Sequence, residues 1–316
     1  MGCETLSERV IFIAGPTASG KSQIGIELAK RIRGEILSLD AYAVYRRMDI
    51  GTAKPTPAER AEVPHHLIDL VEPYELFDVA KYLTIAHKTV TDILNRDRTP
   101  IFVGGTPMYL RMLVSGIFDG PPANETLRRQ LESELAGLSA EAITAKLARV
   151  DPVSAARLHP NNRRRIIRAL EVFTLTGKPI SEWQTQWERP TPKSGPKIFV
   201  PEWERAELYD RINRRVEKMF AMGLVEEVRR LRAEPRGFGR TAATAIGYRE
   251  VLEYLDGHLT LPLCVEQVQA HTRQFSRRQW TFLRSFPESQ LRRIPMNATV
   301  TAEWVAATIL AERMVM

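Results

Sequence analysis

Short apolar runs alternate with longer amphipathic stretches over the first third of the sequence. Residues 10–14 form an apolar run that a glycine ends, which is typical of a buried parallel strand. The stretch 21–34 repeats apolar residues at helical spacing and ends in a glycine, so we expect a helix with a glycine stop. Further strands are predicted over 35–41 and 99–105, with a helix over 79–95 between them. This alternation predicts a parallel α/β sheet with right-handed crossovers.

Helical periodicity replaces the alternation in the middle of the chain. From residue 125 to about 176 the apolar spacing is helical and no strand is evident. A segment rich in Pro and Lys, 186–197, is expected to be an exposed linker before the chain returns to the sheet. We therefore predict an α/β core made of 1–119 and 196–316, interrupted by an all-helical insertion over 120–195.

The last third reads as mostly helical. Long helical stretches are predicted over 204–233, 241–255 and 263–285. Beyond Pro287 the pattern is weak, and no element is predicted there.

Charge and cysteine content exclude some classes of protein. The formal net charge of +7 is compatible with a polyanionic partner but does not require one. Cys3 and Cys264 lie far apart without a C-x-x-C pair, which argues against structural zinc or a disulfide framework. No apolar run is long enough to cross a membrane, and the first residues do not resemble a secretory signal. We expect a cytoplasmic monomer.

The first predicted strand leads into a phosphate-binding motif, G-x-x-x-x-G-K-[ST]. In such a loop the glycines let backbone amides turn toward an anion, the lysine adds a positive charge, and the final hydroxyl binds Mg²⁺. A merely flexible turn is the alternative, but the strand before it and the helix after it favour phosphate binding. The predicted phosphate-binding residues are Gly15, Pro16, Thr17, Ala18, Ser19, Gly20, Lys21 and Ser22, with Ser22 as the metal ligand.

Two polar residues follow the next predicted strands. Asp40 ends the second strand and would face the same crevice as the motif, either as a general base or Mg²⁺ organiser or simply as a helix or turn cap. Thr106 follows a double glycine after the third strand, where it could cap the next helix, bind substrate, or do both. The third strand ends without an acid, which argues against a motor or switch ATPase.

Several segments in fixed order resemble the bacterial tRNA dimethylallyltransferases, also called tRNA isopentenyltransferases. The resemblance runs from about residue 10 to 286. The matching segments are GPTASGKS, DAYAVYRRMDIGTAKPT, HHLIDLVEP, PIFVGGTPMYLRML, RRRIIRALEVFTLTGKPIS, AIGYRE and TRQFSRRQWTFLR. Membership would imply a P-loop NTPase-like fold, a Mg²⁺ cofactor, and transfer of the dimethylallyl group of dimethylallyl diphosphate to the N6 amine of the adenosine 3′ of a tRNA anticodon.

The resemblance also implies roles for individual residues. Asp40 would be the general base on the adenosine amine, and Thr106 would help to orient the reacting groups. Arg211 would neutralise the diphosphate leaving group, with Arg215 as the second candidate, although both could also belong to a solvated helix face. The family often has Ser and Gln where this chain has Ala41 and Ala43, which leaves base recognition by those side chains in doubt.

A partner RNA would have to present its target base unstacked, and two basic segments could hold that RNA. One segment is NNRRRIIRALE, in which the apolar residues are expected to face inward, and the other is HTRQFSRRQW. The aromatic residues beside the second segment are more often core than stacking platforms. The predicted tRNA anticodon stem-loop contacts are Asp40, Ala41, Tyr42, Ala43, Thr106, Arg128, Arg164, Arg165, Ile166, Ile167, Arg168, Arg273 and Arg277.

Two other hypotheses remain open at this point. A P-loop small-molecule or nucleotide kinase would use ATP as a phosphoryl donor, and a nucleic-acid-binding switch would bind RNA without modifying it. The adjacent His65 and His66 have no evident third ligand nearby, so we expect a structural or edge role rather than a metal site.

Overall fold

The computed structural model describes residues 9–116, 120–184 and 196–314 of the chain. The chain divides into two compact units. The larger unit contains residues 4–114 and 193–316, and the smaller unit contains residues 115–192. The boundaries predicted from the sequence, 120 and 195, fall within a few residues of this division.

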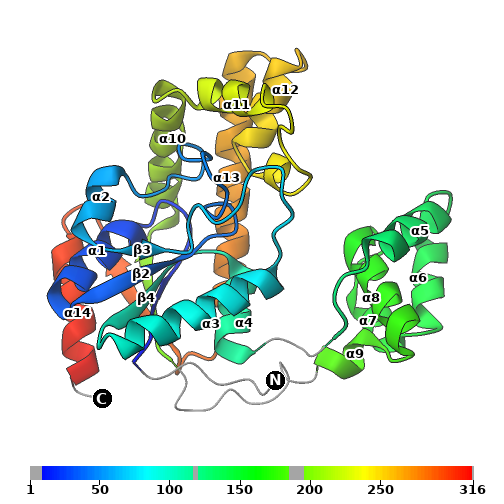
Figure 1. Ribbon diagram of the computed structural model, residues 1–316, viewed down its shortest axis with the longest axis horizontal. Coiled ribbons are helices and arrows are strands. Elements are labelled where there is room, and N and C mark those ends of the chain that lie inside the picture. The colour runs from blue at the N-terminus through cyan, green and yellow to red at the C-terminus, as the bar shows by residue number, and fades with distance from the viewer. Residues whose placement is uncertain (1–8, 117–119, 185–195, 315–316) are drawn as a thin grey trace. The chain divides into compact units, whose positions relative to one another are not determined.

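The larger unit is built on one six-stranded sheet, as Figure 1 shows. All its strand pairs are parallel, which confirms the predicted fold class. The register places Ile11 opposite Ile101 and Phe12 opposite Ile198. In spatial order the strands are β3 (His65–His66), β2 (Gly34–Leu39), β4 (Thr99–Gly104), β1 (Ile11–Ala14), β5 (Ile198–Trp203) and β6 (Leu291–Met296).

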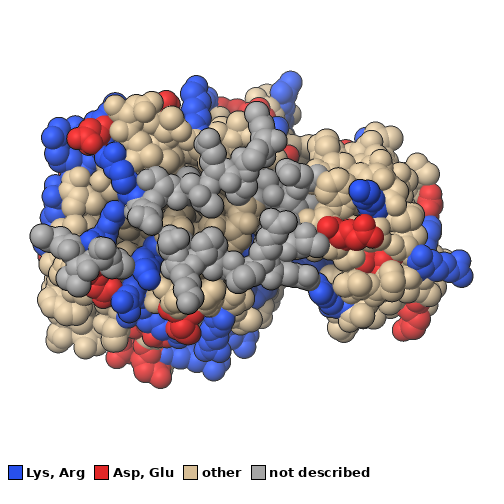
Figure 2. Space-filling view, turned by 90° about the horizontal axis from the view of Figure 1, so that it is seen from below, with Lys and Arg blue, Asp and Glu red and all other residues tan. Residues whose placement is uncertain are grey.

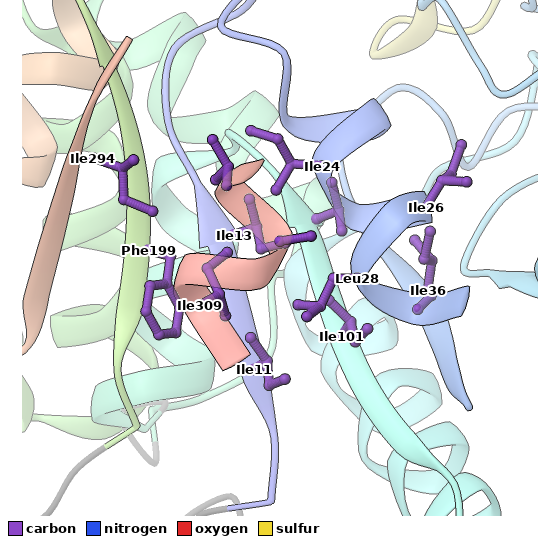
Figure 3. Packing of buried hydrophobic residues seen from close by; sticks show 14 of the residues in the cluster. Ile11, Ile13, Ile24, Ile26, Leu28, Ile36, Ile101, Phe199, Ile294 and Ile309 are labelled. Atoms are coloured by element: carbon purple, nitrogen blue, oxygen red, sulfur yellow. The ribbon is translucent and has the colours of Figure 1, made fainter. Parts of the chain in front are cut away.

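Helices cover both faces of this sheet (Figure 1). On one face lie α1 (Lys21–Ile32) and α14 (Ala302–Met314), and on the other lie α3 (Val79–Asn95) and α4 (Pro107–Ser115). Alternate strand residues supply the two cores: Ile11 and Ile13 face α1 and α14, as Figure 3 shows, whereas Phe12 stacks on Phe102 behind them. A short helix, α2 (Pro57–Glu62), precedes the edge strand β3.

The helices that follow β5 are shorter and more often interrupted than the hydrophobic pattern of the sequence predicts. The expected helix 204–233 is divided at Gly223, whose φ of 97° interrupts the right-handed geometry. The expected helix 241–255 becomes a single 3-10 turn followed by a short α-helix. The observed elements are α10 (Arg205–Ala221), α11 (Leu224–Arg232), η2 (Ala242–Thr244), α12 (Tyr248–Leu255) and α13 (Leu261–Leu283).

Two further local expectations were wrong. The helix stop is Arg33, which takes the left-handed conformation itself at φ 53°, while Gly34 opens β2. Gly34 is needed there for space, because a Cβ on it would lie 2.6 Å from Cδ1 of Ile101. The tail beyond Pro287 is also structured, since it forms β6 and α14.

The smaller unit is a helical bundle with its own core. Its helices are α5 (Glu125–Leu135), α6 (Ala140–Ala148), α7 (Pro152–Arg157), α8 (Arg163–Thr176) and α9 (Ile180–Trp183). Leucine and isoleucine side chains from α5, α6 and α8 form that core, and Trp183 packs against it. The predicted linker 186–197 lies mostly outside the described residues. No described helix of either unit is long and apolar enough to cross a membrane.

Candidate active site

The phosphate loop, Gly15–Ser22, connects β1 to α1 and keeps several amides open. Ala18 and Gly20 have φ values of 63° and 93°. Left-handed residues in such a turn allow successive N–H groups to converge on an anion. The amides of Ala18, Ser19 and Gly20 make no hydrogen bond within the described part of the chain. The first amides of α1 lack helical partners by geometry. The loop therefore offers an array of unused donors to an anion.

The first residues of the motif contribute less than predicted. The amide of Gly15 donates to the carbonyl of Gly104 over 3.3 Å, and the amide of Thr17 donates to Oε1 of Gln279 over 2.9 Å. Pro16 has no amide hydrogen. These three residues shape the loop, and Ala18–Ser22 supply the donors.

Three side chains from the last third of the chain hold the outside of the loop. Gln279 of α13 also donates to the carbonyl of Gly105 over 2.7 Å. Trp203 of β5 donates its indole N–H to the carbonyl of Ser19 over 3.0 Å. Arg211 of α10 donates from Nε to the carbonyl of Ala18 over 2.9 Å. Sequence reasoning did not identify Gln279 or Trp203, because neither belongs to a local motif.

The double glycine at the end of β4 is required by close approach. A Cβ on Gly104 would lie 2.3 Å from the carbonyl oxygen of Leu39. A Cβ on Gly105 would lie 2.5 Å from the carbonyl oxygen of Gly15 and 2.3 Å from Nε2 of Gln279. Any side chain at these positions would separate strand ends that meet at the phosphate loop.

Three charged side chains meet beside the loop. Burial lowers the pKa of Lys21 to about 7, the charge of Arg215 lowers it as well, and the carboxylate of Asp40 partly offsets both effects. Burial also lowers the pKa of Arg215, again opposed by Asp40. Nζ of Lys21 donates to the carbonyl of Pro16. The side chain of Arg215 makes no hydrogen bond or ion pair within the described residues, so this cation is available to a ligand.

Asp40 is held by hydrogen bonds through one of its two carboxylate oxygens. Its Oδ1 accepts the amides of Tyr42 and Ala43 over 2.8 and 3.2 Å, so the turn-cap interpretation is correct for that oxygen. Its other carboxylate oxygen accepts no hydrogen bond within the described part of the chain. One oxygen therefore fixes the carboxylate in place and leaves the second for a substrate proton.

Thr106 connects the ends of β4 and β2. Its Oγ1 accepts the amide of Ala41 over 3.0 Å, and its own amide donates to the carbonyl of Leu39 over 3.1 Å. Because the hydroxyl acts as an acceptor in this bond, its hydrogen remains free to donate. Thr106 is thus positioned next to Asp40 with one unused donor.

Arg211 contacts the phosphate loop from α10. Its guanidinium stacks over the Trp203 ring, 4.1 Å from the centroid, while Nε donates to the carbonyl of Ala18. These contacts give Arg211 a part in supporting the loop, and a role on a leaving group stays a prediction for Arg211 and for Arg215.

The serine at the end of the phosphate loop is the protein group that could bind a magnesium ion. Ser22 is exposed at the start of α1, and its hydroxyl makes no hydrogen bond within the described residues. Those residues include no cluster of three or more His, Cys, Asp or Glu side chains that could hold a metal. This donor set fits Mg²⁺, which commonly takes one or two protein oxygens and completes its shell with phosphate and water. His65 and His66 form the edge strand β3, where His66 binds Glu35 over 2.7 Å.

Comparison with known proteins identifies the family. A model described as IPP transferase matches residues 43–286, and one described as isopentenyl transferase matches residues 8–69. A tRNA dimethylallyltransferase of Rhodopirellula baltica is 46% identical over 291 residues, covering 90% of this chain and 87% of the relative. One of Pelotomaculum thermopropionicum is 44% identical over 291 residues, covering 91% of each. This chain belongs to the tRNA dimethylallyltransferase family.

Solved structures agree with this assignment. The full-length tRNA isopentenylpyrophosphate transferase of Bacillus halodurans is 35% identical, with a TM-score of 0.68 over 98% of each chain. A eukaryotic dimethylallyltransferase acting on tRNA is 28% identical, with a TM-score of 0.75 over 97% of this chain and 77% of that one. Membership of the tRNA dimethylallyltransferase family favours prenyl transfer over the kinase and switch hypotheses.

The segment with Ala41 and Ala43, where Ser and Gln were expected from the family resemblance, directly follows Asp40. Ala43 is only 4% exposed, so its side chain belongs to the core rather than to the predicted RNA contacts. Ala41 is partly exposed beside Thr106. Tyr42 extends across to η2, where its hydroxyl lies 3.3 Å from Oγ1 of Thr244. Tyr42 is therefore the largest polar group that this segment offers to a base.

The second basic segment lies on α13. Arg273 donates from Nη1 to Oδ1 of Asn213 over 2.6 Å, which connects α13 to α10. Arg277 is exposed and makes no hydrogen bond or ion pair with its side chain in the described part of the chain. Phe286 is buried, in agreement with the core role favoured for these aromatic residues, whereas Trp280 packs against the core but is only partly buried.

The smaller unit uses several of its predicted RNA-binding residues for its own structure. Ile166 and Ile167 are 0% and 8% exposed in its core, so their side chains cannot form an RNA surface as predicted. Arg128 and Arg168 bind Oε2 of the fully buried Glu171 over 3.0 and 2.7 Å.

Only part of the predicted basic surface therefore remains open. Arg164 and Arg165 are exposed, and their side chains make no hydrogen bond or ion pair within the described residues. Figure 2 shows basic and acidic side chains interspersed over one face of the larger unit, so the net charge is not concentrated in a single field there.

Proposed function

We propose that this chain transfers the dimethylallyl group of dimethylallyl diphosphate to the N6 amine of the adenosine 3′ of the anticodon in tRNA. The bond between the allylic carbon and the diphosphate oxygen breaks, and a bond from N6 to that carbon forms. Diphosphate leaves, and the amine loses one proton. The observation that carries the proposal is a phosphate loop with open amides beside Lys21, Arg215 and Asp40, in a chain of the tRNA dimethylallyltransferase family.

The loop lowers the barrier by stabilising the leaving group. Negative charge develops on the diphosphate as the carbon–oxygen bond breaks, and the open amides of the loop would stabilise it. Lys21 and Arg215 add positive charge in a buried setting, where it acts more strongly than in water. Interactions that strengthen as charge develops raise the rate more than uniform substrate binding does.

Asp40 and Thr106 act on the acceptor. The free carboxylate oxygen of Asp40 takes the N6 proton, while the other oxygen stays bonded to the amides of Tyr42 and Ala43. The free hydroxyl hydrogen of Thr106 donates to a substrate oxygen or ring nitrogen. A stacked adenosine could not reach these groups, so the base must leave its stack to react.

The residue set fits a magnesium ion held by Ser22. When bound, Mg²⁺ would supply positive charge to the diphosphate oxygens. The Ser22 hydroxyl would be its protein ligand, and this chain otherwise contributes the amides of the loop.

One incubation tests the proposal. The purified chain is mixed with tRNA, Mg²⁺ and dimethylallyl diphosphate, and the digested nucleosides are analysed by mass; we expect adenosine with one added dimethylallyl group. A parallel reaction contains labelled ATP and small-molecule acceptors. Transfer of the γ-phosphate without any prenylated adenosine would overturn the proposal in favour of a kinase.

A further inference from the structure

A pocket of about 300 Å³ lies between the start of α10 and the end of α13, beside the carboxyl end of β5. Its lining includes the aromatic side chains of Trp203, Tyr209 and Trp280. None of its lining residues belongs to the phosphate loop or to the segment from Asp40 to Ala43. The pocket is therefore separate from the groups assigned to the reaction.

One residue that lines the pocket nevertheless also contacts the phosphate loop. The Trp203 ring lines the pocket, while its indole N–H holds the carbonyl of Ser19. Arg211 stacks on the same ring and holds the carbonyl of Ala18. A ligand in the pocket would consequently contact a residue that supports the loop.

Three arginines line the pocket, and two of them have no partner. Arg277 and Arg284 lie two turns apart on α13, both are exposed, and neither side chain forms an ion pair or hydrogen bond within the described residues. Arg205 is partly engaged, since its Nε donates to the Tyr209 hydroxyl over 3.3 Å. Exposed cations that no carboxylate neutralises attract a phosphate.

A hydroxyl without a partner lies among the lining residues. Ser276 is 1% exposed, and its Oγ makes no hydrogen bond. Two threonines of the same helix behave differently, because Thr272 and Thr281 donate back to the carbonyls of Val268 and Arg277 over 2.6 and 3.1 Å. A buried hydroxyl normally finds such a partner. The Ser276 Oγ is itself closed to solvent, so it would meet a ligand in the pocket only after its side chain rotates.

We propose that this pocket binds a single nucleotide unit. Its base stacks on Trp280, its phosphate binds Arg277 and Arg284, and a polar atom of the ligand meets Ser276. Glu202 also lines the pocket; its Oε1 accepts from Arg293 over 3.3 Å, and its Oε2 accepts no hydrogen bond within the described residues. An ionised carboxylate only accepts hydrogen bonds, so Oε2 favours a base that carries an exocyclic amine. The nucleotide comes either from the tRNA itself, a source that depends on the proposed function, or from a free mononucleotide, a source that does not.

Free mononucleotides give the first test. CMP and UMP are titrated calorimetrically, because they are similar in size, only CMP has an exocyclic amine, and neither is the proposed adenosine acceptor. We expect CMP to bind more tightly than UMP, and Trp280→Leu to weaken CMP by roughly 5- to 100-fold through loss of stacking. Trp304→Leu is the matched control, since Trp304 is 54% exposed on α14 and outside the pocket.

Ser276→Ala separates binding from packing. Removal of an unpartnered buried hydroxyl should raise the melting temperature of the free protein by a few degrees, while it weakens CMP binding. A purely structural serine would change the melting temperature without changing affinity. The melting temperature of Trp280→Leu, measured in the same way, shows whether that variant is folded.

RNA-binding measurements show whether the nucleotide belongs to the tRNA or is a free mononucleotide. Binding of an anticodon stem-loop is measured against salt for the Arg277→Ala, Arg284→Ala double variant and for Arg278→Ala, an arginine of α13 outside the pocket. A salt slope that falls by roughly one per lost phosphate contact in the double variant alone assigns the pocket to RNA. CMP binding that saturating stem-loop leaves unchanged assigns it to a free nucleotide.

The proposal is overturned if Trp280→Leu and Trp304→Leu bind CMP and stem-loop equally well. It is also overturned if dimethylallyl diphosphate is the only one of these ligands whose affinity depends on Trp280. Both readouts are binding measurements, so a failure here is distinct from a failure to prenylate tRNA.

Discussion

In the larger unit, Arg215 lies beside the phosphate loop without an ion pair in the described residues, whereas in the smaller unit Arg128 and Arg168 both bind the buried Glu171. Both regions read as basic helices in the sequence. In the larger unit, the Arg215 side chain stays available to a ligand, although burial disfavours its charged form. In the second, the positive charges stabilise a carboxylate inside a small core. The difference lies in whether a carboxylate contacts the cation: Glu171 is three residues from Arg168 but 43 residues from Arg128.

The largest expected effect is the loss of the general base in the larger unit. Asp40→Asn keeps an oxygen that can accept the amides of Tyr42 and Ala43 but cannot take a proton. We expect turnover of tRNA to fall roughly 10²–10⁴-fold while both substrates still bind, as measured by single-turnover kinetics and equilibrium binding. Unchanged turnover would remove Asp40 from the mechanism.

The corresponding change in the smaller unit should affect stability. Glu171→Leu leaves Arg128 and Arg168 without their shared carboxylate, and we expect a loss of about 3 kcal/mol in the free energy of unfolding of this unit. Urea unfolding followed by tryptophan fluorescence measures it. Replacing both arginines by Met in the same chain should restore much of the loss, and a failure to do so would show that Glu171 acts through contacts other than this ion network.

The pH dependence of diphosphate binding tests the open cations. An anion prefers the protonated form of Lys21, whose pKa burial lowers to about 7, so affinity for inorganic diphosphate should be complete below pH 7 and fall by up to about tenfold per pH unit above it. Lys21→Ala should lose this component and keep only the titration of the ligand itself. An identical pH profile in both proteins would contradict the assignment.

The same pKa has the opposite consequence for the free protein. Between about 7 and the ordinary value of 10.5, the unfolded chain holds a proton that the folded chain lacks. The stability of the unliganded protein should therefore rise with pH across this window, as far as Lys21 alone is concerned. Denaturant titrations of wild type and Lys21→Ala at pH 6.5 and 9 measure the difference.

The smallest expected effect is on tRNA binding, and it distinguishes the exposed arginines of α8 from the one that pairs with Glu171. Arg164→Ala with Arg165→Ala should weaken tRNA binding a few-fold and flatten its salt dependence, because both side chains are exposed and unpaired within the described residues. Arg168→Ala should instead lower stability, since it removes a partner of Glu171. Equal effects of the two changes on the salt slope would mean that Arg168 also contacts RNA.

Local patterns were sufficient for four strands of the central sheet, β1, β2, β4 and β5, and for the phosphate-binding motif between β1 and α1. The helix predicted over 79–95 is observed as α3, because its apolar stripe is regular and Asp78 caps its start. β6 was missed because only three of its six residues are buried, as suits an edge strand. The supports of the loop, Gln279 and Trp203, could not be identified, since each acts on a residue more than 180 positions away. The magnesium ion, the monomeric state and the cytoplasmic location stay predictions.

The residues of the phosphate loop are synthesised before the residues that support it. Its motif ends at Ser22, whereas the side chains that grip its outer carbonyls and amide come from β5, α10 and α13. A nascent chain that has not yet released α13 from the ribosome carries the complete motif without its brace from Gln279. The phosphate loop therefore lacks one of its supports until α13 has folded, and a fragment that ends before α13 should bind inorganic diphosphate more weakly than the full chain does.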